Sequence, residues 1–242
     1  MRSHSLAATV FFVVTAALVL AGITTSAAPP NPKEELQAVM ARMDKAANEF
    51  KAMTAQVTYV THTDVLNEDN AETGTAVMQK VQPGEVKGLV DFLSPDKHAV
   101  TFEKRQVRQY YPKIKTVQVY DLDERGEQLD KFLMMGFGTS GTELAKDYDM
   151  KVLGTETLKG DTAPSIRLQL IPKSKEALEY LKSVELWIPE QGDPYPRREK
   201  ILQPSGDYRI VTYSELKINP GLKSDALQLK LPAGVKTVYP GK

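Results

Sequence analysis

The sequence contains no cysteine, three histidines and one tryptophan among its 242 residues. The absence of cysteine excludes a disulfide scaffold, thiol catalysis and any cysteine-ligated zinc or iron–sulfur site. Three histidines are few for a histidine-rich metal site, so neither a metal nor a cofactor is predicted. The 31 basic residues are balanced by 31 acidic residues. This balance argues against nucleic acid as the main partner, because nucleic-acid binding usually needs a basic excess.

The sequence has one long apolar run, and it lies at the N-terminus. Arg2 precedes residues 6–23, which are almost all apolar or small, and Thr25-Ser26-Ala27 offers the small residues of a signal-peptidase site. We therefore predict a signal peptide over residues 1–27, cleaved after Ala27 or Ala28, and an exported domain over residues 28–242. An uncleaved anchor is the alternative, since the run is long enough to span a membrane. Ile23 stands where a lipoprotein signal would need cysteine.

Hydrophobic periodicity predicts a helix first and then mostly strands. Residues 33–53 carry an apolar stripe at helical spacing, made of Leu36, Val39, Met40, Met43, Ala47 and Phe50. Period-two alternation predicts strands over residues 55–65, 72–82, 86–93, 97–104, 107–111 and 115–122. Helical spacing returns over residues 124–135 and 139–148, where Thr139 or Ser140 is the expected N-cap and Glu143 lies in the first turn.

Alternating strands resume in the C-terminal half. They are predicted over residues 165–170, 184–188, 197–203, 207–217 and 226–231, with a hairpin turn at residues 204–207. Altogether the pattern gives about ten strands and three or four helices, without regular βαβ alternation. The predicted class is α+β, a single domain in which helices gather on one side of an antiparallel sheet.

The search for catalytic motifs gives no candidate residue. Gly136 to Gly141 fits the pattern GxGxxG, but the residues before it are helical and the sheet looks antiparallel, so a dinucleotide site is not favoured. No GxSxG motif marks a serine hydrolase. His62 and His98 have no adjacent HExxH or carboxylate pattern and are interpreted as ordinary strand residues. We therefore predict that the protein is not an enzyme.

The segment Leu133-Met134-Met135-Gly136-Phe137-Gly138 is unusually apolar for a connection between two helices. Methionine adapts to irregular partners, and glycine gives the backbone extra conformations. The segment is therefore either a lid over an apolar cavity or part of an ordinary core, and the residues alone favour neither.

Several stretches in the middle and C-terminal half resemble one known family in their order along the chain. They are residues 137–141 with 144–149, 168–173, 185–188, 205–208, 217–220 and 231–235, together with residues 94–112. Over the whole exported part, the sequence resembles the periplasmic outer-membrane lipoprotein carriers, the LolA/LolB-like family. The resemblance implies an unclosed antiparallel β-barrel, bent around a hydrophobic cavity and covered by a helical lid.

The same resemblance implies a function without covalent chemistry. Carriers of this family take a lipoprotein from an inner-membrane exporter, shield its acyl chains, and deliver it to an outer-membrane acceptor. For this chain the expectation is a monomer in the periplasm that binds lipoproteins or lipid acyl chains. The expected cavity lining, from strands and helices together, is Met40, Met43, Val57, Tyr59, Val86, Val90, Phe92, Val100, Phe102, Leu133, Met134 and Phe137.

One departure from the family pattern concerns the lid. Family carriers often have an arginine before the strand that is predicted here near Val86, where this chain has Gln82 or Gly84. Lys80 or Lys87 is the available substitute, but lysine lacks the planar multi-donor group of arginine. Three other functions therefore remain open: a periplasmic carrier of free lipid, a lipoprotein-binding sensor or regulator of the same fold, and an exported enzyme.

Overall fold

The computed structural model describes residues 31–103, 105–122 and 132–240. The predicted signal peptide and most of the predicted helix 124–135 lie outside these residues. The helices are α1 (Pro32–Glu49), η1 (Asp64–Leu66), η2 (Pro112–Ile114), α3 (Gly141–Asp147) and α4 (Lys175–Leu178). The strands are β1 (Ala52–Thr63), β2 (Glu68–Gln82), β3 (Glu85–Ser94), β4 (His98–Glu103), β5 (Gln106–Tyr111), β6 (Thr116–Asp121), β7 (Tyr148–Glu156), β8 (Ser165–Pro172), β9 (Ser183–Pro189), β10 (Arg198–Leu202), β11 (Tyr208–Ile218) and β12 (Lys236–Val238).

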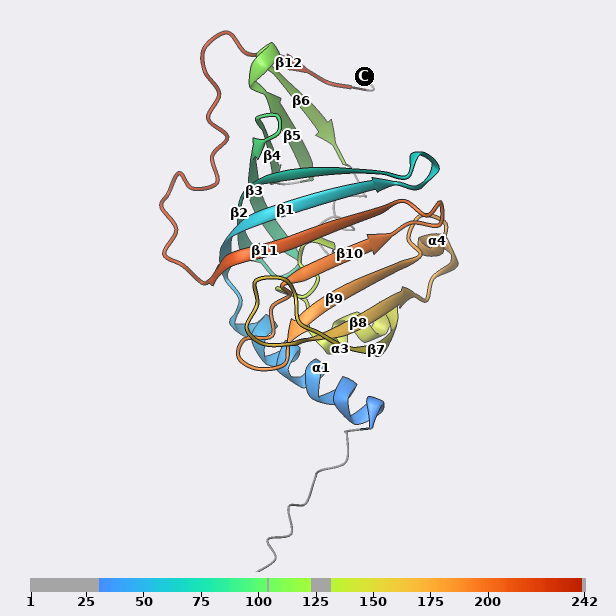
Figure 1. Ribbon diagram of the computed structural model, residues 1–242. Coiled ribbons are helices and arrows are strands. Elements are labelled where there is room, and N and C mark those ends of the chain that lie inside the picture. Colours follow the sequence, from blue (N-terminus) through green and yellow to red (C-terminus); the bar gives the residue numbers. More distant parts are fainter. Residues whose placement is uncertain (1–30, 104, 123–131, 241–242) are drawn as a thin grey trace, which may run out of the picture. The chain divides into compact units, whose positions relative to one another are not determined.

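In the described part of the chain, twelve strands form one continuous sheet. Their order is β12-β6-β5-β4-β3-β2-β1-β11-β10-β9-β8-β7, and neighbouring strands are antiparallel except for the parallel pair β12 and β6. The two edge strands, β7 and β12, stand at opposite ends of this order, so the sheet is unclosed (Figure 1). The predicted class, an open antiparallel half-barrel with helices, is confirmed.

Local signals explain where α1 begins and ends. The Asn31 side chain accepts a hydrogen bond from the Lys33 backbone N–H at 3.1 Å, and Pro32 occupies the first turn. Phe50 is extended, so the helix ends at Glu49 rather than at residue 53 as predicted, and β1 begins at Ala52. The predicted range was too long because the apolar residues of β1 continue the helical stripe by coincidence.

The helices cover one end of the sheet. Val39 and Met43 of α1 and Leu144 of α3 pack on the inner faces of β8 and β9, where Leu168, Leu170, Leu186 and Ile188 are fully buried. Gly141 permits close approach of the two helices, because a Cβ at this position would lie 2.8 Å from the Met40 Cα atom. Ser140 and Glu143 form a capping box at the start of α3, as their spacing predicts.

A second apolar cluster joins the end of α1 to the middle of the sheet. Phe50 packs with Phe137 and Tyr195, with ring centroids 5.9 Å apart in each pair. The predicted apolar connection supplies Met134 and Phe137 to this cluster, together with residues of β1, β2 and β3. The Met134 carbonyl accepts hydrogen bonds from the N–H groups of residues 137, 138 and 139, so the connection is a tightly packed turn. Gly136 adopts φ +78° in this turn.

The C-terminal segment differs from the prediction. Residues 226–231 do not form a strand; the last strand is β12, which pairs with β6 after the chain has crossed the sheet (Figure 1). Turn hydrogen bonds join Ala226 N to Lys223 O and Gln228 N to Asp225 O. The alternating leucines of this segment predict a strand. In the structure Leu229 packs on Tyr110 and Val117, but the backbone of residues 226–231 pairs with no strand.

Two elements at the other edge of the sheet, β7 and α4, were not predicted from the sequence. Strand β7 has one paired neighbour, β8, and half or more of its residues are exposed. An edge strand with few buried positions carries little of the alternation that reveals central strands. Helix α4 has four residues, too few for a helical period to be visible.

Asn219 fixes the junction between α1 and the sheet. Its Oδ1 atom accepts hydrogen bonds from the backbone N–H groups of Lys51 and Ala52 at 2.7 and 3.1 Å. Its Nδ2 atom donates to the Glu49 carbonyl at 2.9 Å. Asn219 also adopts φ +52°, which asparagine tolerates better than most residues. The residue therefore holds the last turn of α1 and the first residues of β1 together.

We expect Asn219→Ala to lower the free energy of unfolding by about 1–3 kcal/mol, because it removes these hydrogen bonds and strains the backbone. Urea unfolding followed by circular dichroism measures this change. Asn219→Gly relieves the strain but not the lost hydrogen bonds, so it should fall between Asn219→Ala and the parent. An unchanged midpoint for both variants would show that the junction does not depend on Asn219. Asn70→Ala, at an exposed position of β2, is the neutral control.

Candidate functional site

An apolar cavity of about 420 Å³ lies against the inner faces of β1 to β5, β10 and β11. Its volume is within the range of small-molecule sites. Residues 132 and 133, where the apolar connection begins, line it from the side of the helices. The cavity is therefore formed by the part of the sheet that α1 and α3 do not cover.

The register of β3 and β4 places their aromatic side chains on the cavity face. Val90 pairs with Val100, and Gly88 pairs with Phe102. A Cβ at Gly88 would lie 2.0 Å from the Phe102 ring, so only glycine leaves room for that ring. Phe92 packs edge-on against Tyr59, with ring centroids 6.0 Å apart. Leu89 lies on the opposite face of β3, as strand alternation requires.

The structure brings seven of the twelve predicted lining residues to this cavity. They are Val57, Tyr59, Val90, Phe92, Val100, Phe102 and Leu133. The other five lie in the packed regions around it. Met43 belongs to the cluster under α1, Met40 lies against Gly141 of α3, and Val86, Met134 and Phe137 belong to the cluster around Phe50. A role of any of these side chains in binding a ligand stays a prediction.

Phe137 stands directly behind the cavity wall. Its side chain is 1% exposed, and its ring contacts that of Tyr213 edge-on at a centroid distance of 5.3 Å. Tyr213 in turn lines the cavity. Phe137 is thus a core residue that shares one wall residue with the cavity, and in this structure it does not fill the cavity itself.

Sequence reasoning missed a buried acid in the cavity wall. Glu199 of β10 is 6% exposed, and among the described residues its Oε1 atom has no hydrogen-bond partner. Burial raises the pKa of the Glu199 carboxyl group from 4.5 to about 8, and a hydrogen bond from Tyr213 opposes this rise only in part. Glu199 shares one face of β10 with Ile201, two residues later, and both side chains line the cavity. The charged residues Arg198 and Lys200 on either side obscure this pattern in the sequence.

Polar groups also occur where β2, β4 and β11 border the cavity. The His98 Nδ1 atom lies 3.7 Å from Glu72 Oε1, and the His98 ring stacks on Phe92 at 4.5 Å. Arg209 of β11 is exposed. The cavity therefore combines an apolar wall with a charged border, an arrangement typical of sites for amphipathic ligands.

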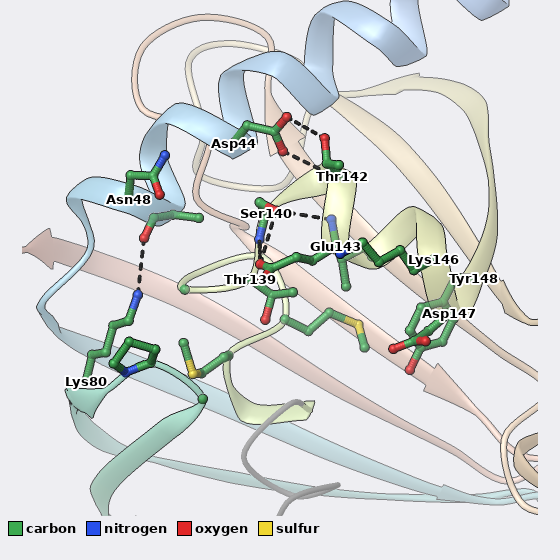
Figure 2. Close-up of a pocket in the computed structure, with 17 residues that line it drawn as sticks. Asp44, Asn48, Lys80, Thr139, Ser140, Thr142, Glu143, Lys146, Asp147 and Tyr148 are labelled. Carbon is green, nitrogen blue, oxygen red and sulfur yellow. Dashed lines mark hydrogen bonds between the residues drawn. The ribbon is translucent and has the colours of Figure 1, made fainter.

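A larger hollow of about 800 Å³ lies between α1, α3 and the turn that joins β2 to β3 (Figure 2). Two pairs of its polar side chains are bonded to one another. The Asp44 carboxylate accepts hydrogen bonds from the N–H and hydroxyl groups of Thr142 at 2.9 and 2.7 Å, and Ser140 and Glu143 form the capping box. These bonds connect α1 to α3. The hollow is less suited than the cavity to an apolar ligand, because charged side chains surround it.

The two lysines considered as substitutes for the family's arginine differ in position. The Lys80 Nζ atom lies 3.5 Å from the Ala47 carbonyl in the last turns of α1 (Figure 2). Lys87 Nζ instead lies 3.6 Å from Glu103 Oε1 on β4. Gln82 bonds to Glu85 in the β2–β3 turn, and Gly84 adopts φ +77° there. Of these four residues, Lys80 is the one that contacts the helix.

In residues 31–103, 105–122 and 132–240, no helix is both long enough and apolar enough to cross a membrane. Within the same ranges, no three histidine, aspartate or glutamate side chains are grouped so that they could hold a metal ion.

Comparison with known proteins gives likeness in structure but not in sequence. No protein-family model matches the chain, and no curated protein matches it significantly. Among solved structures, MucB matches with a TM-score of 0.51 and 14% identity, over 81% of this chain and 63% of that chain. The chain shares its fold with MucB, and its open antiparallel half-barrel is the one expected of a LolA-like fold. The expected resemblance is thus confirmed at the level of the fold.

Two further structures show how distant the similarity is. A LolA superfamily protein from Nitrosomonas europaea gives a TM-score of 0.40 at 14% identity, over 80% of this chain and 97% of that one. The lipoprotein LppX from Mycobacterium tuberculosis gives a TM-score of 0.47 at 12% identity, over 78% of this chain and 98% of that one. At such identities a shared LolA-like fold carries no information about the ligand, which has to be argued from the cavity itself.

The raised pKa of Glu199 predicts a pH-dependent stability. The folded protein holds a proton on this group up to about pH 8, whereas the unfolded chain releases it near its ordinary value of 4.5. This group's contribution to the free energy of unfolding is therefore largest below about pH 4.5 and is lost as the pH rises through 8. Glu199→Gln removes this dependence, so we expect the variant to be more stable than the parent at pH 8–9, by a few kcal/mol.

Thermal unfolding of both proteins between pH 5 and pH 9 measures the difference. Glu68→Gln, at an exposed position of β2, is the control and should follow the parent at every pH. A stability difference between Glu199→Gln and its parent that does not grow with pH would contradict the assignment of a protonated Glu199.

Proposed function

We propose that the protein is a non-enzymatic periplasmic carrier that shelters acyl chains of a lipoprotein in the cavity between β1–β5, β10 and β11. The observation that carries this proposal is the apolar cavity itself, at which the predicted aromatic face of β3 and β4 meets residues 132 and 133. The predicted signal peptide at residues 1–27 supports export. The open, LolA-like sheet supports a carrier, because its uncovered inner face is available to a ligand.

Transfer of an acyl chain into such a cavity needs no covalent step. Each buried methylene contributes roughly 0.8 kcal/mol, so a long chain is held by contact with the wall alone. Release then requires that protein side chains replace the ligand, because the same apolar surface must otherwise face water. Residues 132–138 are the nearest candidates for this replacement, since Leu133 lines the cavity and Phe137 lies behind its wall.

The partners belong to the same proposal. A carrier of this kind accepts a lipoprotein from an inner-membrane exporter and passes it to an outer-membrane acceptor, and it acts as a monomer. Native mass spectrometry of the protein purified from its own periplasm tests the cargo directly. A co-purifying lipoprotein supports the proposal. Phospholipid alone would indicate a free-lipid carrier, and a stable complex with a membrane-anchored protein that brings no lipid would indicate a sensor or regulator.

A charge in the cavity should prevent acyl-chain binding. Phe92→Glu or Phe102→Glu places a carboxylate in an apolar wall, where it must lose its hydration or take up a proton at a cost of several kcal/mol. We expect affinity for a fluorescent fatty acid to fall at least tenfold in a fluorescence titration. Leu93→Glu is the matched control, because Leu93 is exposed on β3 and lies on the face opposite Phe92. Equal loss in the control, or none in the cavity variants, would refute the assignment of the binding face.

Phe137→Ala tests whether residues 132–138 compete with the ligand. If the empty state depends on the packing of Phe137 against Tyr213, the variant weakens the empty state more than the loaded state. Apparent affinity for the acyl chain should then rise, and transfer to an acceptor should slow, in a two-protein transfer assay. Leu144→Ala in α3 is the control, since it also opens a buried site but lies away from the cavity. Unchanged affinity and transfer in a folded Phe137→Ala variant would mean that the segment is only part of the core.

A further inference from the structure

Glu199 is the one buried acid among the described residues, and the cavity explains its position. It lies on β10, an inner strand of the sheet between β9 and β11 (Figure 1). The Tyr213 hydroxyl hydrogen-bonds to the carboxyl group, while Oε1 is buried without a partner among the described residues. An unpaired buried polar atom is costly and rare in folded proteins. A ligand in the cavity would supply the missing partner.

The groups around Glu199 leave its charge uncompensated. Its cross-strand neighbours are Leu186 on β9 and Val211 on β11. Residues 132 and 133, on the helical side of the cavity, are apolar. The other ionisable side chains of the cavity are Tyr213 beside Glu199, Arg209 further along β11, Tyr59 of β1, and Glu72 and His98. Burial is the largest influence on the pKa of Glu199, followed by Tyr213. At neutral pH the carboxyl group therefore carries a proton.

We propose that Glu199 is a ligand-recognition residue whose carboxylic acid donates a hydrogen bond to the carbonyl oxygen of an ester or amide at the head of a bound acyl chain. Tyr213 positions this acid by donating to its other oxygen. The site therefore prefers an acyl ester or amide to a chain that has no carbonyl group. This inference rests on the proposed function, because it names the chemical class of ligand for the same cavity.

The chemistry of the wall favours this class of ligand. A protonated acid in an apolar wall is a hydrogen-bond donor, and a site built to hydrogen-bond a polar group rejects analogues that lack it. A carbonyl oxygen accepts such a bond with no charge to bury, whereas the carboxylate of a free fatty acid would bring a charge into the apolar wall. Ester and amide share the carbonyl oxygen; the first is typical of glycerolipids and the second of N-acylated chains.

Three fluorescently labelled probes with the same hydrocarbon chain test the proposal. They are an acyl methyl ester, an acyl N-methylamide and the corresponding alkyl methyl ether, which lacks the carbonyl oxygen. Fluorescence titration at pH 7 should give about three- to tenfold tighter binding of the ester or the amide than of the ether, as expected for one hydrogen bond. The preferred member of the ester–amide pair identifies the source of the ligand.

Two variants assign the preference to Glu199. Glu199→Gln keeps a donor and should keep the preference, whereas Glu199→Leu should bind all three probes within about twofold of one another. Glu185→Gln is the control, because Glu185 on neighbouring β9 pairs with Arg167 on the opposite face. In the parent the preference should vanish at pH 9.5, where the acid is ionised, and it should persist in Glu199→Gln. The comparison at pH 9.5 uses only the parent and Glu199→Gln, so it does not require that Glu199→Leu folds.

The outcomes separate this inference from the proposed function. If no probe binds the parent, the carrier function fails. If all three probes bind the parent equally, or if the preference survives in Glu199→Leu, the carrier function stands and the role of Glu199 is refuted. Tighter binding of the matching alkylammonium probe than of the ester would also refute it, because the acid would then act as an anion.

Discussion

The architecture depends on one constraint: a wide sheet with an apolar face must keep that face out of water. Helices α1 and α3 meet this need over β8 and β9, where Leu168, Leu170 and Ile188 are almost inaccessible. The described helices do not cover β3 and β4 in the same way. The side chains of Phe92 and Phe102 border a cavity there instead. The same kind of surface is thus a core in one half of the sheet and the wall of a cavity in the other. What differs is the cover and not the sheet.

Strand alternation was enough to predict the cavity face, because the register of a sheet fixes which side chains share a side. Val90, Phe92, Val100 and Phe102 therefore lie together as expected. Features that depend on distant contacts were not predictable. Phe137 belongs to a segment whose composition suggests a lid, but its ring packs between those of Phe50 and Tyr213. Glu199 looks like a surface residue in Arg198-Glu199-Lys200, and only the sheet places it inside. The parallel pairing of β12 with β6 likewise depends on a chain crossing that no local pattern records.

Apart from residues 94–112, which supply part of the cavity wall, the stretches that carry the family resemblance hold the scaffold together and do not line the cavity. Trp187 lies between Arg167 and Arg198, at 5.2 and 5.5 Å, and its indole N–H donates to Glu156. Asp207 in the β10–β11 turn accepts a hydrogen bond from Asp64 N at 2.9 Å, which ties that turn to the β1–β2 hairpin. These residues join strands that are distant in sequence. Resemblance at such positions therefore indicates a fold, whereas the cavity wall also contains residues such as Glu199 and Ile201 that lie outside these stretches.

The position of α1 limits which part of the structure can uncover the cavity. Three carbonyls in its last turn accept bonds from other elements: Ala46 from the Tyr195 hydroxyl at 3.0 Å, Ala47 from Lys80, and Glu49 from Asn219. Two more bonds join Asp44 to Thr142 of α3. Movement of α1 would break all of these at once. Movement of residues 132 and 133 would break none of them, because both side chains contact the cavity rather than these bonds. A single arginine latch is therefore not required to hold α1, and in the proposed carrier the apolar segment that follows residue 131 is the part that can move without breaking these bonds.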